Sequence, residues 1–318
     1  MSTALPASPY FTLQQLAEGV YAAVIVPGMW GAWGNAGIVN LGESALVFDT
    51  FLTPQAARAL RAAAEQVTGA PIRYVVNSHY HMDHIHGNQV FTDAVIVATE
   101  KTHERIATRG VEVLAETRAH PEYPEELEAR REREPDEAKR AALAAEAGDY
   151  RALNAALPEL ELRLPTVTFD ERIIFHGGQR QAELLSYGGG HTVSDAFLYL
   201  PSERIAFMGD LVPVQTHLTF YGDADNWLRI LERVMQLDMQ ALVPGHGAVG
   251  TQADCALARQ YIADLQALAQ QIAARGGTEE DATILPIPAA YADWAAPTVF
   301  AANMRYCYQR AAQAQGRE

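Results

Sequence analysis

The sequence predicts an α/β fold on three observations. A strand, a helix and a strand follow one another between residues 45 and 77, which is the pattern of a βαβ unit. A second mixture of strands and helices begins near residue 167. Between these halves, from about residue 103 to 164, strand signals disappear and Ala, Glu and Arg dominate. Two α/β layers around a common core, interrupted by a helical insert, account for this pattern.

Apolar β-rich runs and helix punctuation assign the elements of the first half. Pro54 opens a helix that should run to about Val67, and Gly69 lies just past its end in the capping position. The stretch 28–37 is rich in Gly and carries Met29 and two Trp residues, so it is either a hairpin tip or a mobile apolar flap. Strands are expected over residues 20–26, 38–40, 45–48, 72–77 and 94–98.

The insert at about 103–164 should form two or three helices, broken at Pro135 and Gly148. Its run of Glu and Arg fits a solvated helical face, and it equally fits a cap over an active site. We therefore expect residues 1–318 to form one domain that carries this insert.

The second half returns to strands and ends in helices. Residues 195–200 and 205–208 flank a short turn and predict a hairpin, and a helix is expected over 224–237. Thr251 and Asp254 form a capping-box pattern for a long helix that ends at 276–277. Further strands are expected at 167–169, 172–175, 182–186 and 241–244, with a final helix at about 297–315.

Composition and charge bound the partners of this chain. A formal net charge of −15 disfavours binding to phosphate backbones and to anionic membranes, so we expect a small-molecule substrate, no nucleic acid and no membrane. Cys255 and Cys307 are too few for a disulfide framework. Because the N-terminal residues also lack a signal-peptide pattern, a cytoplasmic location is expected. Oligomeric state has no signature in this sequence.

The stretch SHYHMDHIHGN at residues 78–88 concentrates four of the ten histidines. His79, His81 and Asp83 alternate, so on an extended segment their side chains would converge on one side. His84 projects elsewhere and, together with Asp83, could serve a second metal. His86 falls outside this HxHxDH pattern and is interpreted as a loop histidine rather than a ligand.

Three more metal-binding side chains follow at the ends of later strands, each in a Gly-flanked loop. His191 follows a run of three glycines, Asp210 follows Gly209, and His246 lies between two glycines. Open α/β sheets place their sites at the carboxyl ends of strands, and glycine lets the backbone approach a ligand closely there.

This ordered set resembles the metallo-β-lactamase-fold superfamily. The resemblance rests on Asp49 after an early strand, the HxHxDH motif, and then His191, Asp210 and His246. It covers most of the chain, and the insert is the main departure. The resemblance implies a four-layer αββα sandwich with a dinuclear metal site at one edge of its two sheets.

The resemblance also implies a ligand set. His79, His81 and His191 would hold the first metal, Asp83, His84 and His246 the second, and Asp210 would bridge the two. Imidazole and carboxylate ligands suit two Zn²⁺ ions, with Fe or Mn as alternatives. Asp49 would orient a ligating imidazole, although it could instead cap the turn before Pro54.

No cysteine belongs to the set, so it looks more like the glyoxalase II, lactonase and general hydrolase branches than the β-lactamase branch with a Cys ligand. A histidine at position 81 favours hydrolysis over the redox di-iron branch. We expect a bridging hydroxide to attack an ester, lactone or thioester carbonyl. The alternatives are a β-lactam hydrolase, a phosphodiester or sulfate ester hydrolase, and a metal-binding or sensor protein without catalysis.

Three residues are candidates for moving protons or polarising a carbonyl. Asp83 could carry the proton of the leaving group, and the loop after Asp210 offers Tyr221 and His217. Trp227, on the helix that follows, is expected to pack in the core.

Overall fold

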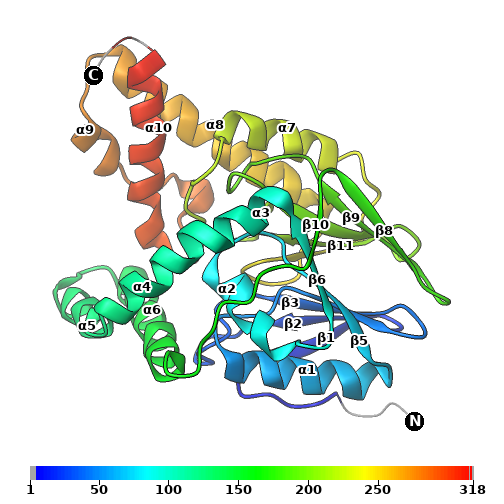
Figure 1. Ribbon diagram of the computed structural model, residues 1–318. Coiled ribbons are helices and arrows are strands. Elements are labelled where there is room, and N and C mark those ends of the chain that lie inside the picture. Colours follow the sequence, from blue (N-terminus) through cyan, green and yellow to red (C-terminus); the bar gives the residue numbers. More distant parts are fainter. Residues whose placement is uncertain (1–4, 315, 317–318) are drawn as a thin grey trace.

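Two β-sheets form the centre of the protein in the computed structural model, which describes residues 5–314 and 316 (Figure 1). The first sheet has seven strands, ordered as in the sequence: β1 (Thr12–Ala17), β2 (Val20–Val24), β3 (Ala36–Asn40), β4 (Ala45–Phe48), β5 (Ile72–Val76), β6 (Val95–Thr99) and β7 (Val167–Phe169). The second has five, in the spatial order β12 (Ala241–Pro244), β11 (Ile205–Gly209), β10 (Ala196–Leu200), β9 (Gln181–Ser186) and β8 (Arg172–His176).

Alternation along single strands divides the core into layers. In β4, Ala45 and Val47 pack with helix α1 (Pro54–Thr68), whereas Leu46 and Phe48 pack between the sheets. In β10, Phe197 packs with α7 (Ala224–Val234) and α8 (Gln252–Ala274) on the outer face of the second sheet. Because successive side chains of a strand point to opposite faces, each sheet is covered on both sides. The order helix, sheet, sheet, helix confirms the predicted αββα sandwich.

Local sequence signals explain where several helices begin and end. The Thr53 side chain accepts from the Ala56 backbone N–H at the start of α1, and Gly69 ends that helix with a φ of 62°. The capping box predicted for α8 is present at Thr251 and Asp254. The final helix α10 (Phe300–Ala314) follows the 3₁₀ turn η4 (Pro297–Val299), and residue 315, its expected end, lies outside the described residues.

The insert is helical, and one of its predicted breaks is wrong. It contains α3 (Glu100–Arg105), η2 (Ile106–Gly110), α4 (Val111–Ala119), α5 (Tyr123–Arg133) and α6 (Glu137–Ala156). Pro135 separates α5 from α6 as expected. Gly148 lies inside α6, where a Cβ would come 2.6 Å from the ring of Trp30, so glycine serves close packing there.

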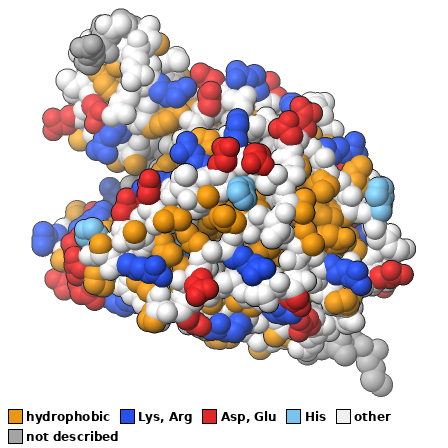
Figure 2. All heavy atoms as spheres, in the orientation of Figure 1, with side chains coloured by type: hydrophobic (Ala, Val, Ile, Leu, Met, Phe, Trp, Pro, Cys, Tyr) orange, Lys and Arg blue, Asp and Glu red, His pale blue; other side chains and the backbone are white. Residues whose placement is uncertain are grey.

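Short elements complete the fold. α2 (Met82–Ile85) and η1 (His86–Val90) follow β5, and α9 (Glu279–Thr283) and η3 (Ala289–Tyr291) lie between α8 and α10. Sequence analysis did not predict β1, whose largely exposed residues give little hydrophobic alternation. In the space-filling view a deep notch separates the arm built by α8, α9 and α10 from the insert (Figure 2). Within the described residues no helix combines the length and hydrophobicity needed to cross a membrane.

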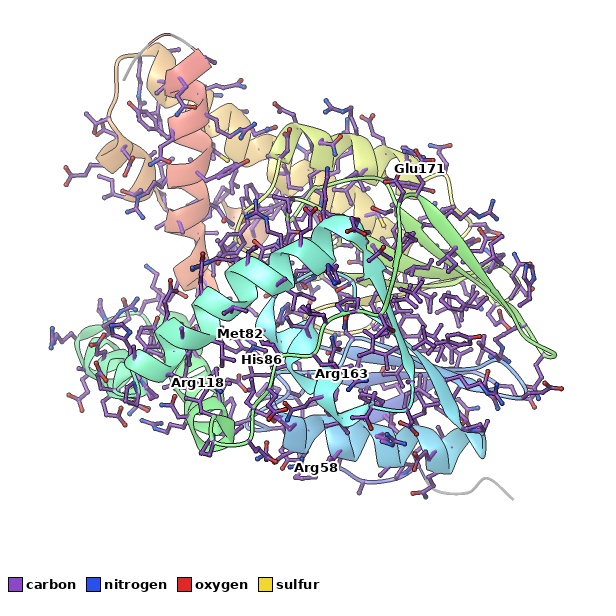
Figure 3. The ribbon with its side chains drawn as sticks, viewed as in Figure 1. Arg58, Met82, His86, Arg118, Arg163 and Glu171 are labelled. Carbon is purple, nitrogen blue, oxygen red and sulfur yellow. The ribbon has the colours of Figure 1, made fainter. Side chains whose placement is uncertain are left out.

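Strand direction brings the chemistry to one edge. β4 and β5 are parallel neighbours in the first sheet, as are β11 and β12 in the second. Asp49, Asn77, Asp210 and Gly245 directly follow these four strands, so the loops they open meet between the sheets. Met82 of α2 and His86 of η1, which follow β5, lie between the sheets and the insert (Figure 3).

Candidate metal centre

The HxHxDH motif changes conformation halfway. His79 and His81 lie in the loop after β5, and His81 is the N-cap of α2, so Asp83 and His84 are helical. The convergence predicted for an extended segment holds for His79 and His81 and is wrong for Asp83, because the chain turns into a helix at Met82. Asp83 points instead toward His84 and His246.

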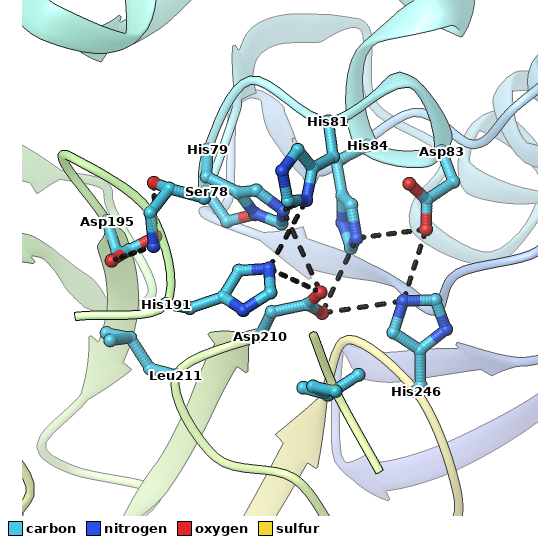
Figure 4. Close-up of polar contacts among 12 residues, drawn as sticks. Ser78, His79, His81, Asp83, His84, His191, Asp195, Asp210, Leu211 and His246 are labelled. Carbon is cyan, nitrogen blue, oxygen red and sulfur yellow. Dashed lines mark hydrogen bonds and ion pairs between the residues drawn. The ribbon is translucent and has the colours of Figure 1, made fainter. Parts of the chain in front are cut away.

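The first cluster joins three imidazoles and one carboxylate (Figure 4). His79 Nε2 lies 2.9 Å from His81 Nδ1, which lies 3.2 Å from His191 Nε2. Asp210 Oδ2 is 3.2 Å from His191 Nε2 and 3.8 Å from His79 Nε2. Four ligand atoms therefore face one another across a common centre.

The second cluster lies on the other side of Asp210. Asp83 Oδ2 is 3.2 Å from His84 Nε2 and 3.1 Å from His246 Nε2. Asp210 Oδ1 is 3.5 Å from each of those two nitrogens. The two oxygens of Asp210 thus face different clusters, as a bridging ligand requires.

The donor atoms fit two metal ions. Ligands at about 2.0–2.1 Å from a tetrahedral zinc are separated by roughly 3.3 Å, close to the spacings of both clusters. His84 Nε2 and Asp210 Oδ1 are buried and make no hydrogen bond within the protein, although buried polar atoms normally have a partner. All donors are nitrogen or oxygen, since both cysteines are buried elsewhere, in the core under α8 and α10.

Burial keeps the imidazoles of His79 and His81 neutral. It lowers the pKa of His79 well below its usual value, and the neighbouring His84 and His81 lower it further. The pKa of His81 is lowered to about 3, by burial first and by His191 second. Neutral imidazole is the protonation state that binds a metal.

Carboxylates dominate the second cluster. Burial disfavours the charged form of His84, but Asp83, Asp49 and Asp210 together outweigh burial and raise the pKa well above its usual value. For His246, burial is likewise overcome by Asp210, which raises the pKa to about 10. The field of these carboxylates attracts positive charge, and a divalent cation satisfies it.

Comparison with known proteins identifies the family. The family model described as the metallo-beta-lactamase superfamily matches residues 34–246, more than half of the chain, and this span holds every candidate ligand. The chain belongs to the metallo-beta-lactamase superfamily. Members of this superfamily are mostly hydrolases and bind divalent metals, usually two.

Solved structures of superfamily members share the fold. A metallo-beta-lactamase from Pontibacter korlensis is 18% identical with a TM-score of 0.57, covering 79% of this chain and 98% of its own. The DIM-1 metallo-beta-lactamase is 16% identical with a TM-score of 0.58, covering 80% and 98%. A metallo-beta-lactamase from Hirschia baltica is 17% identical with a TM-score of 0.53, covering 80% and 97%. At these identities the likeness concerns the fold alone.

Asp49 lies behind the HxHxDH motif and contacts Ser78 and His84. The fully buried carboxylate accepts from the Ser78 backbone N–H at 2.7 Å and from the Ser78 hydroxyl at 2.8 Å. Its Oδ2 also lies 2.8 Å from His84 Nδ1, which leaves His84 Nε2 facing the second cluster. Ser78 Oγ in turn lies 2.9 Å from His79 Nδ1. One carboxylate therefore orients a ligand of each cluster, at a strained φ of 60°.

Substituting Asn for Asp49 is expected to lower metal affinity about 10- to 100-fold, mainly at the second ion. Asn tolerates a positive φ. Its amide nitrogen is a donor, however, and can accept neither from the Ser78 hydroxyl nor from His84 Nδ1. Zinc titration by calorimetry measures the effect, with Asp93→Asn, an exposed partner of Arg61, as the control. Equal affinities in the two variants would refute this role.

Asp195 and Trp227 arrange the loop of His191. The Asp195 carboxylate accepts from the backbone N–H of Gly190 at 2.8 Å and from the Thr192 hydroxyl at 2.7 Å. The buried Trp227 packs in the core as predicted and also lies edge-on to the His191 ring at 5.6 Å.

Tyr221 and His217, the two candidates for contacting substrate, differ in their exposure to solvent. Tyr221 is 56% exposed, and its ring lies 4.8 Å from the ring of His81, so it stands at the mouth of the first cluster. His217 is 1% exposed, contacts Tyr261 through Nδ1 at 2.8 Å and packs against Trp294. Its burial argues against the predicted catalytic role, because a ring enclosed in the core does not reach a substrate.

Asn303 of α10 is a support that sequence analysis missed. This fully buried amide accepts from the Phe220 backbone N–H at 3.0 Å and donates to the Leu218 carbonyl at 2.8 Å. Tyr221, which follows Phe220, donates its own N–H to the His191 carbonyl at 3.1 Å. A lone Asn in a helix carries no local signal for such a contact across 85 residues.

His86 is not in either cluster. It is buried, and its Nδ1 lies 3.2 Å from the Leu52 carbonyl. Nearby, the Asn88 amide donates a hydrogen bond to the Asn77 side-chain oxygen. Asn77 in turn donates to the His84 carbonyl at 3.1 Å, which fixes the position of α2. His86 thus has the loop role that was expected.

Proposed function

We propose that the protein is a dinuclear, metal-dependent hydrolase that cleaves an ester, lactone or thioester bond in a small molecule. The observation that carries this proposal is Asp210, whose two oxygens face two separate clusters of ligands. Two bound divalent ions, for which zinc is proposed, supply an activated water and polarise the scissile carbonyl.

The residues of this chain divide the remaining work. His79, His81 and His191 would hold one ion, and Asp83, His84 and His246 the other, with Asp210 shared. Asp83 is proposed to carry the proton of the attacking water to the leaving group, since its side chain is 12% exposed and faces the second cluster.

Tyr221 is proposed to donate a hydrogen bond to the carbonyl or to the leaving group. Burial raises the pKa of its phenol, so the hydroxyl stays protonated at neutral pH and can donate. Its exposure and its position beside His81 support this role.

Substituting Phe for Tyr221 is expected to lower kcat about 10²- to 10³-fold, the usual cost of removing one such donor. Metal content should be unchanged, because Tyr221 is outside both clusters. Steady-state kinetics on the best substrate measures the effect. Tyr308→Phe is the control, because the Tyr308 hydroxyl donates to the Gly277 carbonyl in the C-terminal arm. A kcat equal to that of the control variant would remove Tyr221 from the mechanism.

Metal analysis combined with a substrate panel tests the proposal. The panel contains lactones, thioesters, aryl esters, β-lactams and phosphate or sulfate esters. Turnover restricted to a β-lactam or to a phosphorus or sulfur ester would select one of those alternatives. Two bound ions without turnover on any substrate would favour a binding or sensor protein.

Partners and location follow from charge and from the cysteines. The net charge of −15 supports a small-molecule substrate rather than nucleic acid or an anionic membrane. Cys255 and Cys307 are free, buried thiols, which supports a reducing, cytoplasmic location.

A further inference from the structure

Three consecutive residues of insert helix α6 hold the stretch 30–34, here called the Trp loop. Gly148 lets the ring of Trp30 pack against the α6 backbone. Asp149 Oδ1 accepts from the Gly31 backbone N–H at 2.8 Å. Tyr150 meets the ring of Trp33 edge-on, with centroids 5.3 Å apart. The Trp loop is therefore packed against the insert rather than free as a flap.

The Trp loop in turn touches the second cluster. The Trp33 carbonyl lies 3.1 Å from His246 Nδ1 and so sets the direction of His246 Nε2. At Gly34 a Cβ would lie 3.2 Å from His84 Cε1, so the backbone passes close to that ligand as well. Asn35, the next residue, donates to the carbonyls of Pro244 and Gly247, both at 2.9 Å.

Asp149 is the charged residue that links the two parts. It is buried, at 6% exposure, and Gly31 N–H is its backbone partner. Its pKa is raised to about 7, chiefly by burial and to a smaller degree by Asp83, while the Gly31 N–H and His246 act to lower it. A buried carboxylate is costly unless it is hydrogen-bonded, and the Gly31 N–H supplies that hydrogen bond to Asp149.

We infer that Asp149 is a positioning residue of the second metal site: through Gly31 and Trp33 it orients the ring of His246. This inference rests on the proposed dinuclear function and deepens it. The insert then acts as a support for His246, which couples the insert to occupancy of the second site. Thr53, which also bonds the Gly31 carbonyl, limits the effect of losing Asp149 alone.

The test compares three variants of the full chain. Asp149→Ala removes the acceptor, and Asp149→Asn keeps an oxygen for Gly31 N–H. Glu146→Ala is the matched control, because Glu146 lies on the same helix and bonds Tyr123 inside the insert. Calorimetric zinc titration of the metal-free proteins resolves the first and second ions. Hydrogen exchange of residues 30–34 in the metal-free proteins reports on the Trp loop independently of metal.

Asp149→Ala is expected to weaken the second ion about tenfold, leave the first unchanged, and speed exchange of the Trp loop. Asp149→Asn and Glu146→Ala should match the unmodified protein. Two ions with unaltered affinities in Asp149→Ala would overturn the inference alone. If Asp149→Ala bound both ions equally more weakly, or if Glu146→Ala also lost affinity for the second ion, the role of Asp149 would be merely structural. Either result would also overturn the inference. Fewer than two ions in the unmodified protein would overturn the proposed function first, before any variant is compared.

Discussion

Substituting Ala for Asp210 is expected to remove both ions and to lower kcat/KM at least about 10³-fold. Each oxygen of Asp210 faces one cluster, so both clusters lose a ligand at once. The buried imidazoles that remain would then have no shared anion between them. Metal analysis after dialysis and steady-state kinetics measure the two losses, which should appear together.

The matched control for Asp210→Ala is Asp238→Ala. Asp238 is exposed, pairs with Arg204 at the surface and belongs to neither cluster. This variant should keep both ions and full turnover. Unchanged activity in Asp210→Ala would refute the assigned site, whatever the metal content of that variant.

The second large effect is expected from a single added methyl group. In Gly245→Ala the new Cβ would overlap Asp210 Oδ1 and would lie 3.0 Å from His84 Cε1. The Asp210 carboxylate would have to move away from both clusters. We expect metal affinity to fall at least about tenfold and stability by about 1–3 kcal/mol, the usual cost of overpacking.

Zinc titration and thermal unfolding measure the consequences of Gly245→Ala. Gly178→Ala is the control, because a Cβ at that position meets no atom within 4 Å. A Gly245→Ala protein that binds two ions with normal affinity would show that Asp210 does not need its present position.

Much of the fold could be predicted because its signals are local. Pro54 and Gly69 mark the two ends of α1, and the Thr251–Asp254 capping box marks the start of α8. Short continuous apolar runs mark strands that are covered on both faces, such as β2 and β11. β1 was missed because only one of its six residues is buried, which leaves little hydrophobic pattern. Gly148 was misread because a glycine that close packing requires can lie inside a helix.

Local chemistry in the sequence also determined the set of candidate ligands. A metal site is indicated by histidine and aspartate residues that lie next to glycine at the ends of apolar strands. This indication does not depend on the details of packing. Excluding His86 from that set needed only the motif, and the structure likewise leaves it outside both clusters.

Only the tertiary structure decided how those residues are grouped and supported. Asp83 joins His246 because α2 starts at Met82, and Asp210 faces two clusters because β11 ends between the sheets. His217 is buried by a C-terminal segment, and Asp149 reaches Gly31 across 118 residues. Ligand type is a property of single side chains, which a sequence states directly. Their distances and burial depend on long-range packing, which no short stretch of sequence encodes.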